Sequence, residues 1–164
     1  MSIDPVKYRQ VLGHFPTGVT VVTGRLDGVP VGFTIGSFTS VSLDPPLVGF
    51  LPMVTSDRWH KIRESGAFCV NVLGNGHDDI CWRFSKSSIE EPFEGVEWHP
   101  SPITGSPVLD AAIAYMDCTI SEVYDAGDHH FVMGHVVELE HAHPDTDPQP
   151  LLFFRGKLGE FVPH

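Results

Sequence analysis

Residues 32–48 read Gly32-Phe33-Thr34-Ile35-Gly36-Ser37-Phe38-Thr39-Ser40-Val41-Ser42-Leu43-Asp44-Pro45-Pro46-Leu47-Val48, and this stretch decides how the rest of the chain is interpreted. It completes a β-type run over residues 29–35, changes to small and hydroxyl-bearing residues, and ends in Asp-Pro-Pro before an apolar run over residues 47–51. This pattern predicts a strand, a polar connection and a second strand. The hydroxyl and backbone N–H groups of the connection suit a planar ligand rich in hydrogen-bonding groups, and a simple Ser/Thr-rich turn explains the same composition.

Outward from this stretch, β-type runs alternate with turns. Strands are expected over residues 19–23, 29–35, 47–51, 67–73, 113–123, 131–139 and 151–155, with Asp27-Gly28 as a hairpin turn. Short helices are expected over residues 4–12, 58–65 and 78–84, and an irregular surface excursion over residues 85–106. Six or seven strands without βαβ alternation predict an all-β dominated fold, an antiparallel barrel with short peripheral helices.

The length and charge of the chain limit its class. With 164 residues and 41% hydrophobic content, residues 1–164 fit a single domain with one core. The formal charge is -11, and most acidic residues follow Trp82, which disfavours nucleic acid and anionic membranes as partners. No apolar run approaches the roughly 20 residues of a membrane span, and the N-terminus lacks a signal-peptide core, so we expect a cytoplasmic location.

Neither the cysteines nor the histidines predict a metal site. Cys69, Cys81 and Cys118 are odd in number and widely spaced, which is typical of reduced, buried thiols and not of a disulfide framework. The histidines between His129 and His143 do not form a recognised ligand spacing with carboxylates or cysteines. No GxGxxG motif follows a predicted strand, so a Rossmann-type nucleotide site is not indicated.

Two helix ends are candidate sites for an anionic group. Thr55 and Ser56 precede the helix over residues 58–65, so free N–H groups, two hydroxyls and Arg58 can gather around a phosphate. Ordinary N-capping of the helix needs only one of those hydroxyls. Arg83 closes the next helix, where its guanidinium either suits a phosphate or complements the helix dipole.

Several motifs in a fixed order carry a resemblance to a known family. They are Phe15-Pro16-Thr17-Gly18-Val19-Thr20-Val21-Val22-Thr23, the stretch quoted first, Phe68-Cys69-Val70-Asn71-Val72-Leu73, Arg83-Phe84-Ser85, Gly127-Asp128-His129 and Pro150-Leu151-Leu152-Phe153-Phe154-Arg155-Gly156. The likeness they carry extends over about residues 6–161, nearly the whole chain. In this order they resemble the short-chain flavin reductases, the small reductase components of two-component flavin-dependent monooxygenases.

The resemblance implies a fold, an activity and a set of binding residues. The fold is a Greek-key FMN-binding split barrel that forms a homodimer, with the flavin near the subunit interface. The activity is hydride transfer from NADH or NADPH to FMN or FAD, and the reduced flavin then diffuses to a partner monooxygenase. The flavin contacts carried over to this chain are Gly36, Ser37, Phe38, Thr39, Ser40, Ser42, Thr55, Ser56, Arg58, Trp59, Arg83 and Phe84. Nicotinamide contacts are assigned to His129, Phe154 and Arg155. No protein side chain has to act as acid or nucleophile in this chemistry, because the cofactors supply the reactivity.

The chain also departs from the family pattern. His130 follows His129 where a β-branched residue is common, and Phe153-Phe154 with Leu158 replaces the expected tyrosines. These departures leave the nicotinamide preference open, as they do the choice between FMN and FAD. Two other functions stay possible from sequence: a non-catalytic electron carrier that retains its flavin on the same barrel, and a ligand-free interaction module.

Overall fold

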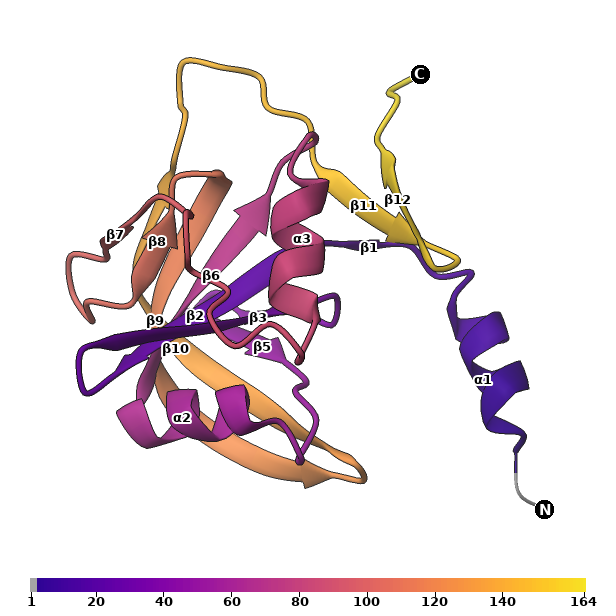
Figure 1. Ribbon diagram of the computed structural model, residues 1–164, viewed down its shortest axis with the longest axis horizontal. Coiled ribbons are helices and arrows are strands. Elements are labelled where there is room, and N and C mark those ends of the chain that lie inside the picture. The colour runs from indigo at the N-terminus through magenta and orange to yellow at the C-terminus, as the bar shows by residue number, and fades with distance from the viewer. Residues whose placement is uncertain (1–2) are drawn as a thin grey trace.

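Seven antiparallel strands form the main sheet, which makes up most of the body in Figure 1. The computed structural model describes residues 3–164. The order across the sheet is β3 (Val29–Ile35), β2 (Thr20–Leu26), β6 (Ala67–Leu73), β9 (Ala112–Ala126), β10 (His129–His141), β5 (Leu47–Phe50) and β4 (Thr39–Ser42). The expectation of an all-β dominated, antiparallel fold is confirmed. Within residues 3–164 the hydrogen-bonded order begins at β3 and ends at β4, so it does not close into a ring.

The sequence does not predict five of the strands, each of which has four residues or fewer. β1 (Thr17–Gly18) and β12 (Lys157–Glu160) both pair with β11 (Leu151–Phe154), and β7 (Trp98–Pro100) pairs with β8 (Pro107–Leu109). β4 replaces part of the predicted polar connection, because three of its residues pair with β5. The expectation of six or seven strands is therefore wrong in number. Such short segments take their β structure from a partner and not from their own apolar alternation.

Helix α2 (Asp57–Ser65) agrees with the helix predicted over residues 58–65. Ser56 is its N-cap, and the helix ends at Gly66, whose φ of 78° lies in the left-handed region that glycine adopts at low cost. Trp59 and Ile62 are the buried residues of α2, and both pack into a hydrophobic cluster on one side of the sheet. Burial of these two side chains fixes the helix against β2 and β3.

A second hydrophobic cluster lies on the other side of the sheet, under helix α3 (Asp78–Ser85). Val21 belongs to this cluster and Val22 to the cluster under α2, because successive strand side chains point to opposite faces. Phe84 of α3 is fully buried in it, with its ring edge-on to Phe93 at a centroid distance of 4.9 Å. The two helices therefore cover opposite faces of one sheet.

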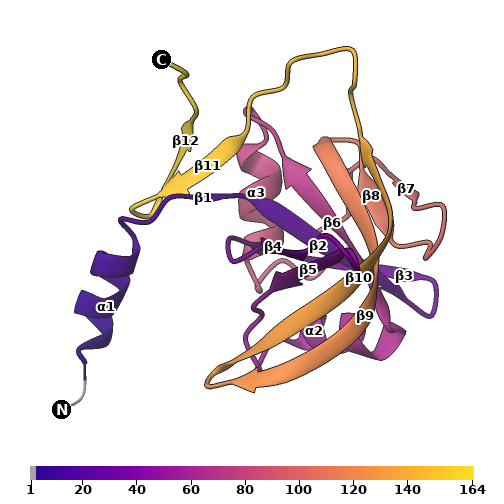
Figure 2. The ribbon, with the colours of Figure 1, turned by 180° about the vertical axis from the view of Figure 1, so that it is seen from behind.

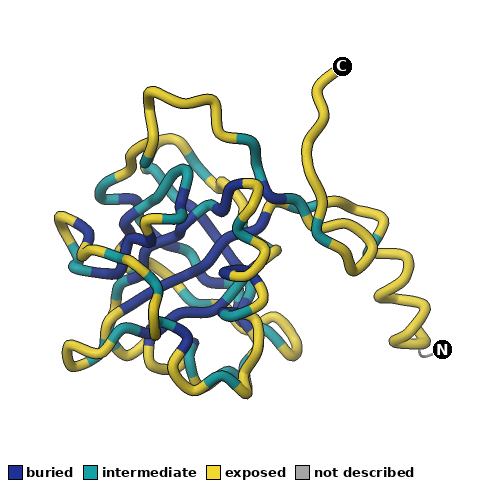
Figure 3. The backbone as a smooth tube through the Cα atoms, turned by 45° about the horizontal axis from the view of Figure 1, so that its top comes forward, coloured by how far each residue is buried: buried dark blue, intermediate teal, exposed yellow. Residues whose placement is uncertain are grey.

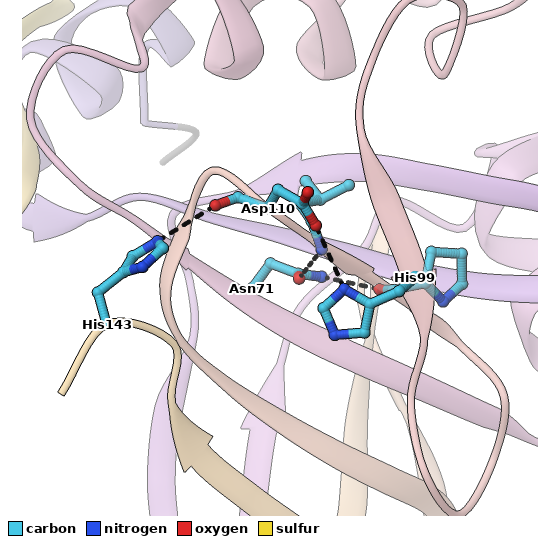
Figure 4. A network of polar contacts seen from close by, with 6 residues as sticks. Asn71, His99, Asp110 and His143 are labelled. Carbon is cyan, nitrogen blue, oxygen red and sulfur yellow. Dashed lines mark hydrogen bonds and ion pairs between the residues drawn. The ribbon is translucent and has the colours of Figure 1, made fainter.

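A polar network ties the β7–β8 pair to the body (Figure 4). Asn71, fully buried on β6, accepts a bond from Leu109 N at 2.8 Å and donates to the carbonyl of Pro107 at 3.3 Å. Asp110 follows directly, and its carboxylate lies 3.2 Å from His99 Nδ1. The carbonyl of the same residue lies 3.3 Å from the ring of His143. The network therefore holds both the β7–β8 pair and the acidic connection over residues 142–150.

The two ends of the chain form an arm that projects from the body in both Figure 1 and Figure 2. The arm consists of α1 (Pro5–Leu12), β1, β11 and β12. Asp4 caps α1 as predicted, accepting a bond from Val6 N at 2.9 Å, but no residue of α1 is buried. Figure 3 shows most of the arm as exposed. Large apolar side chains are exposed along it, namely Val6, Tyr8, Val11, Leu12, Phe15, Phe153 and Phe154.

The three cysteines are free and buried, as predicted. Burial raises the pKa of Cys69 and of Cys118 well above the ordinary value, and it raises the pKa of Cys81 to about 11. All three side chains are therefore protonated near neutral pH. Within residues 3–164, no helix is both long enough and apolar enough to cross a membrane.

Candidate functional site

A groove of about 810 Å³ runs between the edge strand β3 and the start of α2. Its walls come from segments far apart in the sequence: β3, residues 51–53 and 55–58 with Lys61, parts of residues 84–92, and His129. Of the candidate contacts named from sequence, the groove brings together Thr55, Ser56, Arg58, Phe84 and His129. Five of the contacts predicted from sequence therefore line the same groove.

The start of α2 supplies one end of the groove. Ser56 Oγ accepts a bond from Trp59 N at 3.2 Å, so the ordinary N-cap considered from sequence is present. The N–H groups of Asp57 and Arg58 have no partner within the helix, because first-turn N–H groups have no carbonyl four residues before them. Both residues line the groove beside Thr55. This end of the groove therefore offers two backbone N–H groups and a hydroxyl to an anion.

The turn that carries His129 supplies another part of the wall. Gly127 has a φ of 70°, which lets a two-residue turn join β9 to β10. His129 Nδ1 lies 2.7 Å from Asp128 Oδ1, and this hydrogen bond, with the charge of the imidazole, lowers the pKa of the Asp128 carboxyl. Main-chain bonds attach the turn to the segment before α2, with Val54 N donating to Asp128 O at 3.1 Å. His129 thus has a fixed backbone and a half-buried ring at the groove.

Arg58 lines the groove but directs its guanidinium at main-chain carbonyls. Nη1 donates to Phe84 O at 3.0 Å and to Gly32 O at 3.4 Å. Nη2 donates to Lys86 O at 3.2 Å and also to Ile89 O. Partial burial lowers the pKa of this guanidinium from its ordinary value. In this structure Arg58 holds residues 84–89 and β3 to the start of α2, and its contact with a phosphate stays a prediction.

Three other residues predicted as flavin contacts have structural partners instead. Trp59 is fully buried, and its indole Nε1 donates to His130 Nδ1 at 2.9 Å. Phe84 lies at the groove but is fully buried, with its ring in the hydrophobic cluster under α3 and its carbonyl bonded to Arg58. Arg83 donates to the carbonyl of Glu94 and does not line the groove. The position of an arginine or aromatic residue on a helix can indicate that it lies near a site. It does not reveal which distant carbonyl the arginine contacts or in which part of the core the aromatic ring packs.

Residues 36–42, the polar part of the stretch over residues 32–48, lie beside the groove. Ser37 Oγ accepts a bond from Leu51 N at 2.9 Å and donates to Leu51 O at 3.3 Å, so this hydroxyl joins the end of β3 to a groove residue. Phe38 packs against the core, whereas Thr39 and Ser40 are exposed on β4. The other two predicted contacts, Gly36 and Ser42, likewise fall outside the residues that line the groove.

Phe154 and Arg155 lie elsewhere, on the arm. They line a second hollow of about 670 Å³ with Pro16, Leu152 and residues 157–160. A single chain therefore does not bring these two residues to the groove with His129, although sequence reasoning assigned all three to one ligand.

Sequence reasoning missed two parts of the groove. Lys61 lies one helical turn after Arg58 and lines the groove with an exposed side chain, so the helical period from Arg58 was the signal that could have found it. Ser87, Ile89, Glu90 and Pro92 form a wall within the region expected to be an irregular excursion. That segment has no periodicity, and its position depends on the distant Arg58.

The groove has the chemistry of a binding site more than of an acid–base site. Its polar groups at one end suit a phosphate, and the main chain and apolar side chains of β3 and residues 51–53 suit a flat ring system. The donor set therefore fits a phosphorylated ring ligand such as a flavin nucleotide. Within residues 3–164, no three His, Cys, Asp or Glu side chains gather in a metal-binding arrangement.

The chain is similar to known proteins over nearly its whole length. Residues 12–161 match the Flavin reductase like domain. A relative from Mycobacterium tuberculosis, the reductase subunit HsaB of a flavin-dependent monooxygenase, is 48% identical over 94% of this chain and 81% of its own length. The crystal structure of a homologue of nitrilotriacetate monooxygenase component B from Mycobacterium thermoresistibile superposes with a TM-score of 0.92 at 43% identity, covering 96% of this chain and 86% of that one. An NADH:FAD oxidoreductase of Streptomyces globisporus, in complex with NAD and FAD fragments, superposes with a TM-score of 0.89 at 34% identity over 99% and 98% of the two chains.

Proposed function

The chain belongs to the Flavin reductase like domain family, and from this premise we propose that it is the NAD(P)H-dependent reductase that supplies reduced FMN or FAD to a partner monooxygenase. The observation that supports this most directly is the groove, because it combines a helix start suited to an anion with a histidine turn in one place. Relatives named as reductase subunits of flavin-dependent monooxygenases support the partner. Their partner is an oxygenase that consumes the reduced flavin.

The residues of the groove act by binding and orientation. Thr55 and the free N–H groups at the start of α2 hold the flavin phosphate. β3 and residues 51–53 provide a surface for the ring system, and the Ser37–Leu51 bonds keep that surface in place. A flavin held here would supply the redox chemistry, as the acceptor of a hydride from NADH or NADPH. The residues of the groove would orient the two nucleotides toward each other and limit the access of water.

His129 is placed to contact the nicotinamide substrate. Its ring borders the groove, and Asp128 fixes the Nδ1 side of the imidazole, which leaves Nε2 to face a ligand. Replacing His129 with Ala should raise the Michaelis constant for the nicotinamide about three- to tenfold, the cost of one hydrogen bond, and leave flavin affinity nearly unchanged. His141→Ala, an exposed histidine at the far end of β10, is the matched control.

The test combines nicotinamide absorbance with a flavin titration. Purified protein is mixed with NADH or NADPH and with FMN or FAD, and oxidation of the nicotinamide is followed for the wild type and both variants. Turnover that depends on added flavin supports the proposal. Retention of flavin through purification without nicotinamide oxidation would instead support the non-catalytic electron carrier, and absence of flavin binding would support the interaction module.

We further propose that the active unit is a homodimer, in which the arm of one copy covers the groove of the other. The arm exposes a row of large apolar side chains that the body of the same chain leaves uncovered. Phe154 and Arg155 sit on the arm and away from His129, so a second copy is the simplest way to bring all three to one ligand. Light scattering of the full chain tests the state, with Leu12→Asp and Phe15→Asp expected to release monomers. A monomeric wild type that turns over at full rate would contradict the proposal.

A further inference from the structure

His130 makes a buried contact behind the groove wall that the proposed function does not use. The residue is 8% exposed, and its Nδ1 accepts a bond from Trp59 Nε1 at 2.9 Å. Trp59 is fully buried and packs edge-on against Phe50 at a centroid distance of 5.8 Å. Two polar atoms are therefore satisfied by each other inside the hydrophobic cluster under α2. A buried polar pair of this kind specifies one geometry, because losing either partner leaves the other without a bond.

The chemistry of the pair determines which nitrogen of the imidazole carries the proton. An indole N–H is only a donor, so Nδ1 of His130 must present its lone pair to Trp59. The neutral ring therefore carries its proton on Nε2, which lies 3.6 Å from Asp125 Oδ1. That carboxylate is fully solvent-exposed, so the contact with it is weak and the Trp59 bond fixes the ring.

Both partners of the bond lie directly beside groove residues. Trp59 is in the first turn of α2, and the same residue donates its main-chain N–H to the N-cap Ser56 at 3.2 Å. His130 follows His129, and its own N–H donates to Pro52 O at 3.0 Å. The bond thus connects the anion-binding end of the groove to the histidine turn, from behind and out of reach of the ligand.

We infer that His130 is a positioning residue that locks the start of α2 to the His129 turn through the Trp59 indole, so that the flavin end and the nicotinamide end of the groove keep one spacing. The inference rests on the proposed function for the identity of the ligands, but the bond and its effect on groove geometry do not depend on turnover. The residue takes no part in the chemistry, because it lies behind the wall and does not touch the groove.

Three variants separate an acceptor role from mere packing. His130→Leu removes the acceptor and Trp59→Phe removes the donor, whereas His130→Asn keeps an acceptor oxygen near the position of Nδ1. His135→Leu makes the same change on the same strand, at a histidine that does not line the groove, and is the matched control. His130→Leu and Trp59→Phe should each raise both the flavin dissociation constant and the nicotinamide Michaelis constant about three- to tenfold. The turnover number should stay within about twofold, and the double variant should be no worse than either single variant.

A measurement of the bond itself accompanies the kinetics. The indole N–H resonance of Trp59, identified by its absence in Trp59→Phe, should move upfield and exchange faster in His130→Leu but not in His130→Asn. His130→Leu with the binding constants of His135→Leu would overturn the inference, and so would a His130→Asn variant as impaired as His130→Leu. If His130→Leu does not fold, Trp59→Phe and His130→Asn decide the same question. If the wild type oxidises no nicotinamide, the proposed function fails, while the resonance and the flavin titration still test the lock.

Discussion

Replacing Arg58 with Met should loosen the wall formed by residues 84–92 and, through it, the groove. The guanidinium donates to four carbonyls, and two of these, Gly32 O and Phe84 O, belong to buried residues. Methionine keeps much of the aliphatic side chain but leaves those two carbonyls without their donor, at a cost of about 1 to 3 kcal/mol. The carbonyls of Lys86 and Ile89 lie in a more exposed segment, where water can replace the lost bonds. Local opening of the wall is therefore the expected effect, and global unfolding is not.

The rate of trypsin cleavage at one peptide bond measures how often the wall opens. Trypsin cleaves after Lys86, whose carbonyl is one of those that Arg58 holds at 3.2 Å. If opening and closing are fast relative to cleavage, a change of about 1 to 3 kcal/mol speeds cleavage after Lys86 about 5- to 150-fold. Mass spectrometry measures the product directly. Arg63→Met, an exposed arginine at the other end of α2, controls for the loss of charge and of a trypsin site.

Arg58→Lys separates wall positioning from phosphate binding. Lysine retains a cation near the start of α2, but as a single compact charge it cannot reach four carbonyls spread over three segments. Flavin affinity in the Lys variant should therefore fall as far as in the Met variant. Cleavage after Lys86 at the rate of Arg63→Met would refute the wall role, and flavin affinity restored by lysine would return Arg58 to the phosphate.

Two further outcomes test the packing and the thiols. Gly134→Ala places a methyl group 2.3 Å from Phe68 Cζ, and because that ring is fully buried the clash should cost about 1 to 3 kcal/mol, or roughly 2 to 12 °C in Tm. Gly159→Ala, with no atom within 4 Å of the added carbon, should leave Tm nearly unchanged, and equal shifts in the two variants would contradict this account. The raised pKa of Cys81, about 11, keeps its thiolate to about one part in a thousand at pH 8, so Ellman's reagent should label none of the three cysteines in the folded protein and all three after unfolding. Fast labelling of the folded chain would place a thiol at the surface.

The sequence predicted those elements whose signals are local. The hairpin of β2 and β3 followed from β-branched residues around Asp27-Gly28, and both turn residues have positive φ, as a tight hairpin turn requires. α2 followed from the hydroxyl at its start and Gly66 at its end. β4 and β12 could not be predicted in this way, because four polar or mixed residues form a strand only when a partner is already beside them.

The residues of the candidate site also differ in whether their signals are local. Thr55, Ser56 and His129 line the groove, and the sequence singled them out because each belongs to a recognisable motif, a helix start or a turn. The roles of Arg58 and Trp59 depend on contacts with residues 89 and 130, which are far away in sequence and carry no signal of their own. A motif indicates that a residue matters near a ligand, but whether its polar atoms point at the ligand or away from it is decided by the packing of the whole chain.

The hydrophobic core draws its residues almost entirely from the body, since from the arm only Leu151 and the partly buried Leu158 join the clusters. Mutations that change the exposed side chains of the arm therefore leave the packing of the body intact. Natural selection can therefore change the surface of the arm without lowering the stability of the body. In the proposed homodimer, this separation would let the arms of two duplicated genes diverge until each subunit pairs only with its own copy, so that two such reductases share one cell without exchanging subunits.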